Sequence, residues 1–204
     1  DLIVTAGLHA DFIASLAECL ASPQAPAWKV LDWYNLLESS ATPPEMERTA
    51  AQVGWSFSQE PLQHCPYIPL PGDFEKYLAE QVDKKQRHEI RRKMRRATEN
   101  PDPVRWYIVD DEAALDEGIQ AFLSLMAHDP EKEAFLTESM RLQMRLSMQT
   151  AFRAGWLQLS FLEVNGAKAA GYLNFDYNGH LWIYNSGLDF RFRELSPGWV
   201  LLGY

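Results

Sequence analysis

Two Asn-Gly dipeptides, thirteen residues apart, constrain the fold of this 204-residue chain more than any other feature. Asn165-Gly166 and Asn178-Gly179 each separate two runs that are rich in aromatic and aliphatic residues. Tight hairpin turns need positive φ angles at both central residues, which Asn and Gly adopt most easily. The pattern predicts a three-stranded antiparallel meander with strands at 156–164, 168–177 and 180–187.

Hydrophobic periodicity upstream of the meander predicts one strand and two helices. The strand covers 104–109, after the helix-breaking segment Asn100-Pro101-Asp102-Pro103. The first helix places Leu115, Ile119 and Phe122 on one face and ends at His128-Asp129-Pro130, and the second runs from about 131 to 152.

The first seventy residues have a weaker pattern, which predicts strand, helix, strand, helix, strand. Strands are expected at 2–5, within 28–34 and within 55–70, and the first helix covers about 12–20. The second helix opens on Thr42-Pro43-Pro44-Glu45, a capping box, and stops at Gly54. From Asp73 a helix begins, and the basic segment to about Ala97 either continues it or forms a second helix.

The end of the chain combines a strand, a short basic loop and a helix start. Ser196 is a good N-cap, Pro197 suits the first helical position, and Gly198 leaves room for a ligand to approach the first-turn N–H groups. Such a helix start attracts anions. The alternative is an ordinary capped helix that packs against the sheet.

Charge is distributed very unevenly. Between Lys84 and Arg96 lie eight of the nineteen basic residues and one acid, so this window carries +7 and the remainder −16, for a net charge of −9. A phosphate-bearing or acidic partner is therefore expected to be local to one helix, and a general polyanion-binding surface is not expected.

In order and spacing these features resemble the GNAT acyl-CoA transferases, and within them the CelD-like branch, which is related to the FemAB-type aminoacyltransferases. The resemblance covers about residues 70–204 and implies an α/β (α+β) fold with a mixed, mostly antiparallel sheet and flanking helices. In the GNAT pyrophosphate loop, Arg/Gln-x-x-Gly-x-Gly/Ala, Arg193 and Gly198 match and Ser196 replaces the first glycine. The resemblance to the family rests on four segments: Lys84 to Arg92, Gly155 to Leu159, Gly171 to Phe175 and Ser196 to Leu202.

FemAB-type proteins are tandem GNAT-like domains, and this implies a domain arrangement. Residues 1–71 are expected to be the second half of an N-terminal GNAT-like domain, 72–103 a basic connecting helix and linker, and 104–204 the first half of a C-terminal GNAT domain. We therefore expect the natural polypeptide to extend beyond both ends.

The resemblance implies acetyl-CoA or another acyl-CoA as co-substrate, and acyl transfer needs a phosphate cradle, a strand edge for the pantetheine, an oxyanion donor and a base. The strand edge is expected at 184–187. His128 beside Asp129, Asp176 or Asp189 is the candidate base, and Tyr184 is a candidate proton donor to the leaving thiolate. Ordinary structural roles remain the alternative for each: a satisfied histidine, a turn cap for the aspartates and aromatic packing for the tyrosine. Candidate donor-binding residues are Arg191, Arg193, Ser196, Gly198, Trp199 and Val200.

The basic helix has three interpretations. It is a solvated inter-domain helix, a binding site for a substrate or lipid phosphate through Arg87, Arg91 and Arg95, which recur every fourth residue, or a nucleic-acid-binding element. No recognised nucleic-acid motif accompanies it.

The functional prediction is acyl transfer to an amine or hydroxyl of a sugar or cell-envelope precursor. The alternatives are FemAB-like aminoacyl transfer from tRNA and a non-catalytic interaction module with the same fold. Cys19 and Cys65 lie far apart and lack metal-ligand spacing, so neither a disulfide framework nor a metal site is expected, and a reducing cytoplasm fits best. No apolar run approaches the length needed to span a bilayer.

Overall fold

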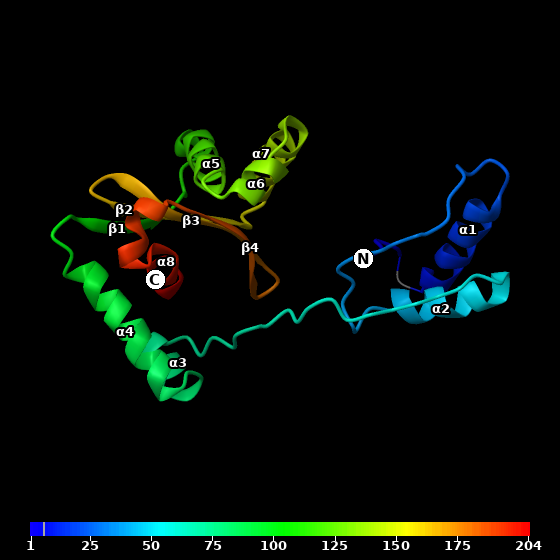
Figure 1. The fold of residues 1–204 in the computed structure, drawn as a ribbon, viewed down its shortest axis with the longest axis horizontal. Helices are drawn as coiled ribbons and strands as arrows, with labels where there is room; N and C mark the ends of the chain where they lie inside the picture. Colours follow the sequence, from blue (N-terminus) through cyan, green and yellow to red (C-terminus); the bar gives the residue numbers. More distant parts are fainter. Residues whose placement is uncertain (6) are drawn as a thin grey trace. The chain divides into compact units, whose positions relative to one another are not determined.

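The computed structural model describes residues 1–5 and 7–204, which form two compact units, Asp1–Pro69 and Leu70–Tyr204 (Figure 1).

Two helices make up the regular structure of the first unit. α1 (His9–Ala21) and α2 (Thr42–Val53) pack together, with Ile13 and Ala17 of α1 buried. The described residues of this unit form no strand, so the strands predicted at 2–5, 28–34 and 55–70 are wrong. Their backbone finds no partner strand to pair with, and several of their apolar side chains, such as those of Val30 and Tyr67, stay exposed.

The capping box predicted for α2 is also wrong. Thr42 is the first helical residue and not the N-cap, because its buried hydroxyl is used elsewhere: it donates to Asp1 Oδ1 at 2.6 Å and lies 3.0 Å from His9 Nε2. The prolines of the first turn and the stop at Gly54, whose φ is 75°, are confirmed.

The second unit is built on a four-stranded antiparallel sheet in the order β1-β2-β3-β4 (Figure 1). The meander is confirmed, and all four residues of the two Asn-Gly turns have positive φ. The register pairs Phe161 with Gly171, where a β-carbon would come 3.0 Å from the Phe161 ring. The strands are β1 (Val104–Ile108), β2 (Leu157–Val164), β3 (Ala167–Tyr177) and β4 (His180–Leu188).

Helices cover both faces of this sheet. On one face, α5 (Glu112–Met126), α6 (Pro130–Phe135) and α7 (Glu138–Arg153) accompany the main core, which includes Phe122, Met148 and Phe161. On the other face, α8 (Pro197–Gly203) and α4 (Lys84–Thr98) enclose a smaller core around Leu162 and Val200. α3 (Phe74–Glu80) precedes α4, and the short 3₁₀ helix η1 (Phe190–Leu195) links β4 to α8. The predicted α/β fold class is confirmed.

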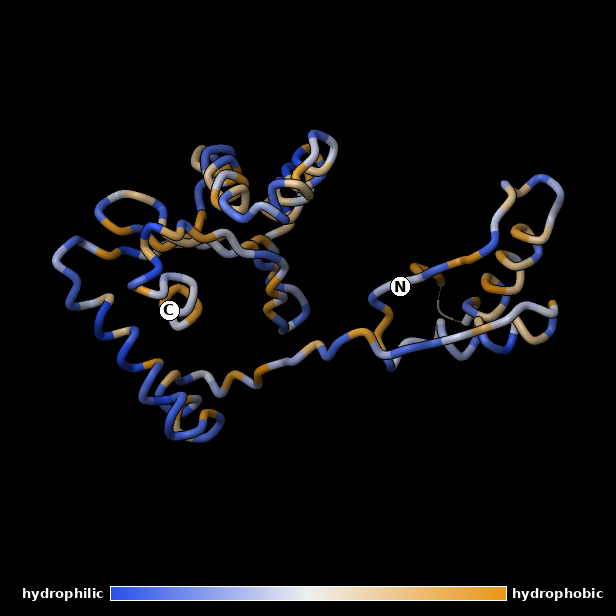
Figure 2. The backbone as a smooth tube through the Cα atoms, in the orientation of Figure 1, coloured by the Kyte–Doolittle hydropathy of each residue, from blue (hydrophilic) through white to orange (hydrophobic). Residues whose placement is uncertain are grey.

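The structure decides two helix predictions in this unit. The basic segment forms its own helix, α4, because Asp83 caps a new start by accepting from Lys85 N and Gln86 N. The single helix predicted at 131–152 is wrong, since the chain breaks between α6 and α7 at Leu136, whose side chain is buried in the main core, and Thr137, which caps α7. Figure 2 shows α4 as the most continuously hydrophilic helix of this unit.

Candidate functional site

The edge of the sheet at β4 is open, because no described strand follows β4 in the strand order. Along an antiparallel strand the backbone polar groups point alternately toward the neighbouring strand and away from it. Asp189 N donates to Ala169 O of the β3 side at 3.0 Å, so the alternate residues Leu188 and Ser186 present their backbone groups to the open edge.

Side chains from the turn after α5 reach these outward groups. His128 Nδ1 lies 3.3 Å from Leu188 O. Lys132 of α6 donates from Nζ to Ser186 O at 2.5 Å and lies 3.5 Å from Ser186 Oγ, while Ser186 N donates to Asn185 Oδ1 at 2.8 Å. The strand edge predicted at 184–187 therefore has its Ser186 backbone groups already bonded within the chain.

Gly187 explains why the end of α5 comes so close to β4. A β-carbon at this position would lie 2.6 Å from Leu125 Cβ and 2.7 Å from Met126 N. Only glycine lets the strand and the helix end touch in this way. His128 and Lys132 are thereby held over the two residues on either side of Gly187.

Arg191, a predicted donor-binding residue, is engaged by the end of β4. Its guanidinium pairs with the buried carboxylate of Asp189, with 2.5 Å between Nη2 and Oδ2. The hydrogen bond from Arg191 holds the pKa of Asp189 below its usual range, outweighing the opposing effect of burial, and the nearby His128 contributes in the same direction. Asp189 also accepts from the Arg191 backbone N–H and so caps η1. The pair orders the loop between β4 and α8.

Ser196 does not cap α8 as predicted. It occupies the N-cap position with φ 51° and ψ 53°, a left-handed conformation that favours glycine, and its side chain makes no capping hydrogen bond. Its hydroxyl instead accepts from Arg96 Nη2 of α4 at 3.3 Å. The first-turn N–H groups of α8 consequently have no side-chain cap.

The other predicted donor-binding residues differ in how they are placed. The room predicted beside Gly198 is wrong: Gly198 is buried, and the space is filled by Leu188, whose Cδ2 lies 3.1 Å from where a β-carbon would be. Val200 is fully buried, and its N–H donates to Ser196 O at 3.1 Å. Trp199 is exposed with Lys93 Nζ 4.7 Å from its ring centroid, and Arg193 is highly exposed.

An orphaned polar atom at this turn fits an anionic group. Arg96 Nε is buried and has no hydrogen-bond partner among the described residues, and Ser196 Oγ is the one partner found for its guanidinium. A guanidinium that makes no ion pair, beside an uncapped helix start, matches the donors that a phosphate needs. Arg96 was missed from the sequence because it lies on the opposite side of the basic helix from the regular arginine row.

That arginine row is divided by the structure. Arg87 Nη2 donates to Ala79 O at 2.9 Å and Val82 O at 3.0 Å, and Arg91 pairs with Glu75 of α3. These two side chains hold α3 against α4. Arg95 is exposed and has no ion-pair partner among residues 1–5 and 7–204.

The three predicted catalytic residues are not brought together. Asp176 pairs with Leu181 in the β3–β4 register, seven residues from Leu188, which corresponds to about 23 Å along the strand from the position of His128. Tyr184 is exposed and packs edge-on against Phe175, with 5.8 Å between ring centroids. Asp129 caps α6, accepting from Glu131 N, and does not pair with His128.

Residues 84–204 match the family model for the acetyltransferase (GNAT) domain, which is more than half of the chain. The chain belongs to the GNAT family. A search of curated proteins and one of solved structures found no match.

Membership of the GNAT family identifies an acyltransferase domain and an acyl-CoA donor. The order of a strand, helices, a three-stranded meander and a helix start is the GNAT arrangement expected from the sequence. No helix of the described chain is long and apolar enough to cross a membrane, and the described residues contain no cluster of His, Cys, Asp and Glu suited to a metal ion.

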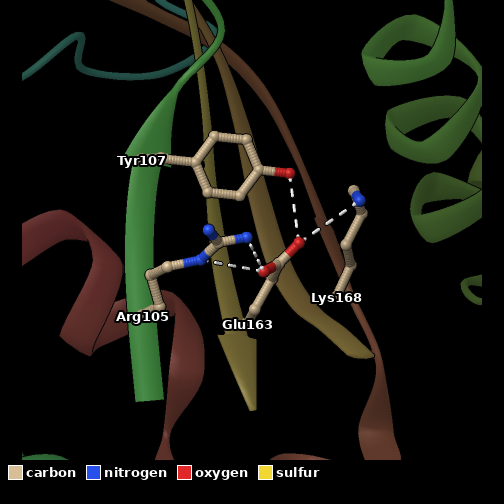
Figure 3. A network of polar contacts seen from close by, with 4 residues as sticks. All are labelled: Arg105, Tyr107, Glu163 and Lys168. Atoms are coloured by element: carbon tan, nitrogen blue, oxygen red, sulfur yellow. Dashed lines mark hydrogen bonds and ion pairs between the residues drawn. The ribbon is translucent and has the colours of Figure 1, made fainter. Parts of the chain in front are cut away.

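A second polar cluster in the GNAT domain was not predicted. Glu163 of β2 accepts from Arg105 Nη2 at 2.6 Å and from the Tyr107 hydroxyl at 3.2 Å, both on β1, and lies 3.4 Å from Lys168 Nζ on β3 (Figure 3). Burial alone raises the pKa of Glu163, but the hydrogen bonds and charges of Arg105 and Lys168 outweigh it and hold the pKa below its usual range.

This cluster borders a pocket of about 650 Å³ at β1 that is also lined by Asp110 and Glu117. The register that pairs Arg105 with Glu163 brings the charges together, and it only became apparent once strand pairing was known. Because the Glu163 carboxylate already has three polar partners within the sheet, we interpret the cluster as structural, stabilising the sheet.

Proposed function

We propose that this GNAT domain transfers an acyl group from acetyl-CoA or another acyl-CoA to an amine or hydroxyl of a sugar or cell-envelope precursor, as a member of the CelD-like branch. The main support for a donor site is that the buried Nε of Arg96 has no hydrogen-bond partner among the described residues. It lies beside the uncapped start of α8, at the end of an open sheet edge. The donor phosphates bind there, with Arg193 and the N–H groups of Gly198 and Trp199 as further contacts.

The pantetheine arm then runs along β4 past Leu188 toward Ser186, where His128 and Lys132 hold the outward carbonyls. His128 lies on this path and is the residue placed to take a proton from the acceptor. With Nδ1–H donating to Leu188 O, the ring leaves Nε2 free as an acceptor, which is the tautomer that general-base catalysis requires. Asp176 of β3 and Tyr184 of β4 lie farther along the sheet from Leu188.

The acceptor is proposed to approach the β4 edge from solvent. Arg95 is the member of the predicted phosphate-binding row whose guanidinium makes neither an ion pair nor a hydrogen bond within the described residues. A phosphorylated acceptor is therefore proposed to contact Arg95, while Arg87 and Arg91 keep α3 and α4 together.

Calorimetric titration of the full-length natural protein with acetyl-CoA and, separately, with free adenosine diphosphate tests the donor. The proposal predicts binding of acetyl-CoA and weaker binding of the nucleotide, together with thermal stabilisation by acetyl-CoA. Absence of acetyl-CoA binding contradicts it.

A salt titration of tRNA binding separates the remaining functions. Steeply salt-dependent tRNA binding without acetyl-CoA binding indicates FemAB-like aminoacyl transfer. Binding of neither ligand indicates a non-catalytic module. The tandem arrangement with a second GNAT-like half at 1–71 stays a prediction.

A further inference from the structure

The basic side chains of the second unit differ in what neutralises them. Among its partly buried ones, Lys93, Arg141, Arg145 and Lys168 each pair with a carboxylate. Arg87, Arg96 and Lys132 find only neutral oxygen partners among the described residues, and those of Arg87 are the carbonyls at the end of α3. A partly desolvated cation without a counter-charge is costly, so its position indicates where a negative charge is expected.

Arg96 and Lys132 lie at the two ends of the proposed donor path, whereas Arg87 holds the end of α3. Arg96 is at the start of α8, where the phosphates are placed, and Lys132 is at Ser186, the residue of β4 toward which the pantetheine is proposed to run. The first is explained by the donor phosphates. The second has no role in the function proposed above.

Lys132 is held in a fixed geometry. Asp129 caps α6 by accepting from Glu131 N at 2.9 Å and Lys132 N at 3.3 Å, and Pro130 occupies its first turn. The ammonium is anchored on Ser186 O at 2.5 Å, with Ser186 Oγ at a longer 3.5 Å. An ammonium has three N–H donors, so at least one remains for a ligand.

We infer that Lys132 is a catalytic residue that donates a hydrogen bond to the carbonyl oxygen of the acyl donor's thioester. The inference rests on the proposed function, because it places the thioester on the β4 edge. As the acceptor nitrogen attacks, the C–N bond forms and the carbonyl electron pair moves onto the oxygen, where Lys132 stabilises the negative charge. The acceptor's proton passes to His128 Nε2. When the carbonyl re-forms, the C–S bond breaks, sulfur leaves as thiolate, and His128 returns the proton to it.

A preorganised cation at such an oxygen acts more strongly on the transition state than on the bound thioester. Removing one donor of this kind lowers the rate of acyl transfer by about 10²–10³-fold in enzymes of known mechanism. The affinity for the donor changes little, because the ground-state carbonyl carries little charge.

The test uses acetyl-CoA labelled with ¹³C at the thioester carbonyl, bound to the full-length protein and observed by isotope-edited infrared spectroscopy. Lys132→Gln is the informative variant, since its amide can still donate to Ser186 O and keep the edge in place without the charge. Lys76→Gln, at an exposed position on α3, is the matched control.

In the wild type and in the Lys76 variant, the bound carbonyl band is expected at lower frequency than for free acetyl-CoA. In Lys132→Gln it should move back toward the free value, with a calorimetric dissociation constant within about threefold of wild type. Lys132→Arg should retain part of the shift.

An unchanged band in Lys132→Gln overturns the inference and leaves the proposed function standing. A dissociation constant raised more than tenfold with an unchanged band likewise assigns Lys132 to another part of the donor. If the wild-type protein does not bind acetyl-CoA at all, the proposed function itself fails. Circular dichroism melting of each variant shows whether the fold is kept.

Discussion

Replacing Gly187 by alanine should destabilise the second unit more than any other glycine-to-alanine change on the sheet. The new β-carbon would lie 2.6 Å from Leu125 Cβ, 2.7 Å from Met126 N and 2.8 Å from Leu125 C. Two of these atoms are backbone, so no side-chain rotation relieves the clash, and β4 or the end of α5 must move. Overpacking of this kind costs about 1–3 kcal/mol, and we expect the upper end of that range.

The matched control is Gly198→Ala, whose nearest contact is the flexible tip of Leu188 at 3.1 Å. Urea unfolding followed by circular dichroism should show a loss of about 3 kcal/mol for Gly187→Ala and below about 1 kcal/mol for Gly198→Ala. Moving β4 also separates Ser186 and Leu188 from Lys132 and His128, so acetyl-CoA affinity should fall in the first variant. Equal stability of the two variants would refute the close approach of α5 and β4.

Three further changes test other parts of the account. Arg96→Met should weaken acetyl-CoA binding about tenfold or more in calorimetry, since it removes a charge-assisted hydrogen bond, whereas Lys85→Met at the far end of α4 should not. Arg87→Met should lower the unfolding free energy by about 1–3 kcal/mol and leave donor affinity unchanged, because it frees carbonyls at the end of α3, while Arg95→Met should leave stability unchanged. Because the pKa of Glu163 is lowered in the folded protein, its carboxylate stabilises the fold above the unfolded pKa of about 4.3, and this stabilisation is lost as pH falls through the folded value. The difference in unfolding free energy between wild type and Glu163→Gln should therefore shrink below about pH 4. A difference that grows there would contradict the network.

Much of the second unit was predictable because its signals are local. The Asn-Gly turns set the hairpins, and the repeat of Leu115, Ile119 and Phe122 set the buried face of α5. Each of these patterns predicts its structure from residues that are close together in the sequence. The first unit has no comparable turn signals, and its apolar runs resemble strands although its described residues offer no partner strand.

Capping was harder to predict than the helices themselves. Thr42 and Ser196 both have the residue type of an N-cap, yet Thr42 bonds to Asp1 and Ser196 to Arg96. In both cases a residue far away in the sequence, by 41 and 100 positions, competes for the hydroxyl. N-cap propensity depends on neighbouring residues only, so it does not include a hydrogen-bond partner that is distant in the sequence.

The site was only partly predictable for the same reason. The turn at Ser196 and the position of His128 follow from residue order, but Arg96 and Lys132 acquire their roles through contacts between separate elements. The φ of 51° at Ser196 also gives a physical reason for the glycine that the GNAT loop has at this place.

Hydrogen–deuterium exchange of the full-length protein, with and without saturating acetyl-CoA, tests the location of the donor site most directly. The account predicts that added acetyl-CoA slows exchange in two segments, 186–188 on β4 and 196–200 at the start of α8, and leaves β1 and the pocket beside Glu163 unchanged. Slower exchange at β1 without any change at 186–200 would contradict it.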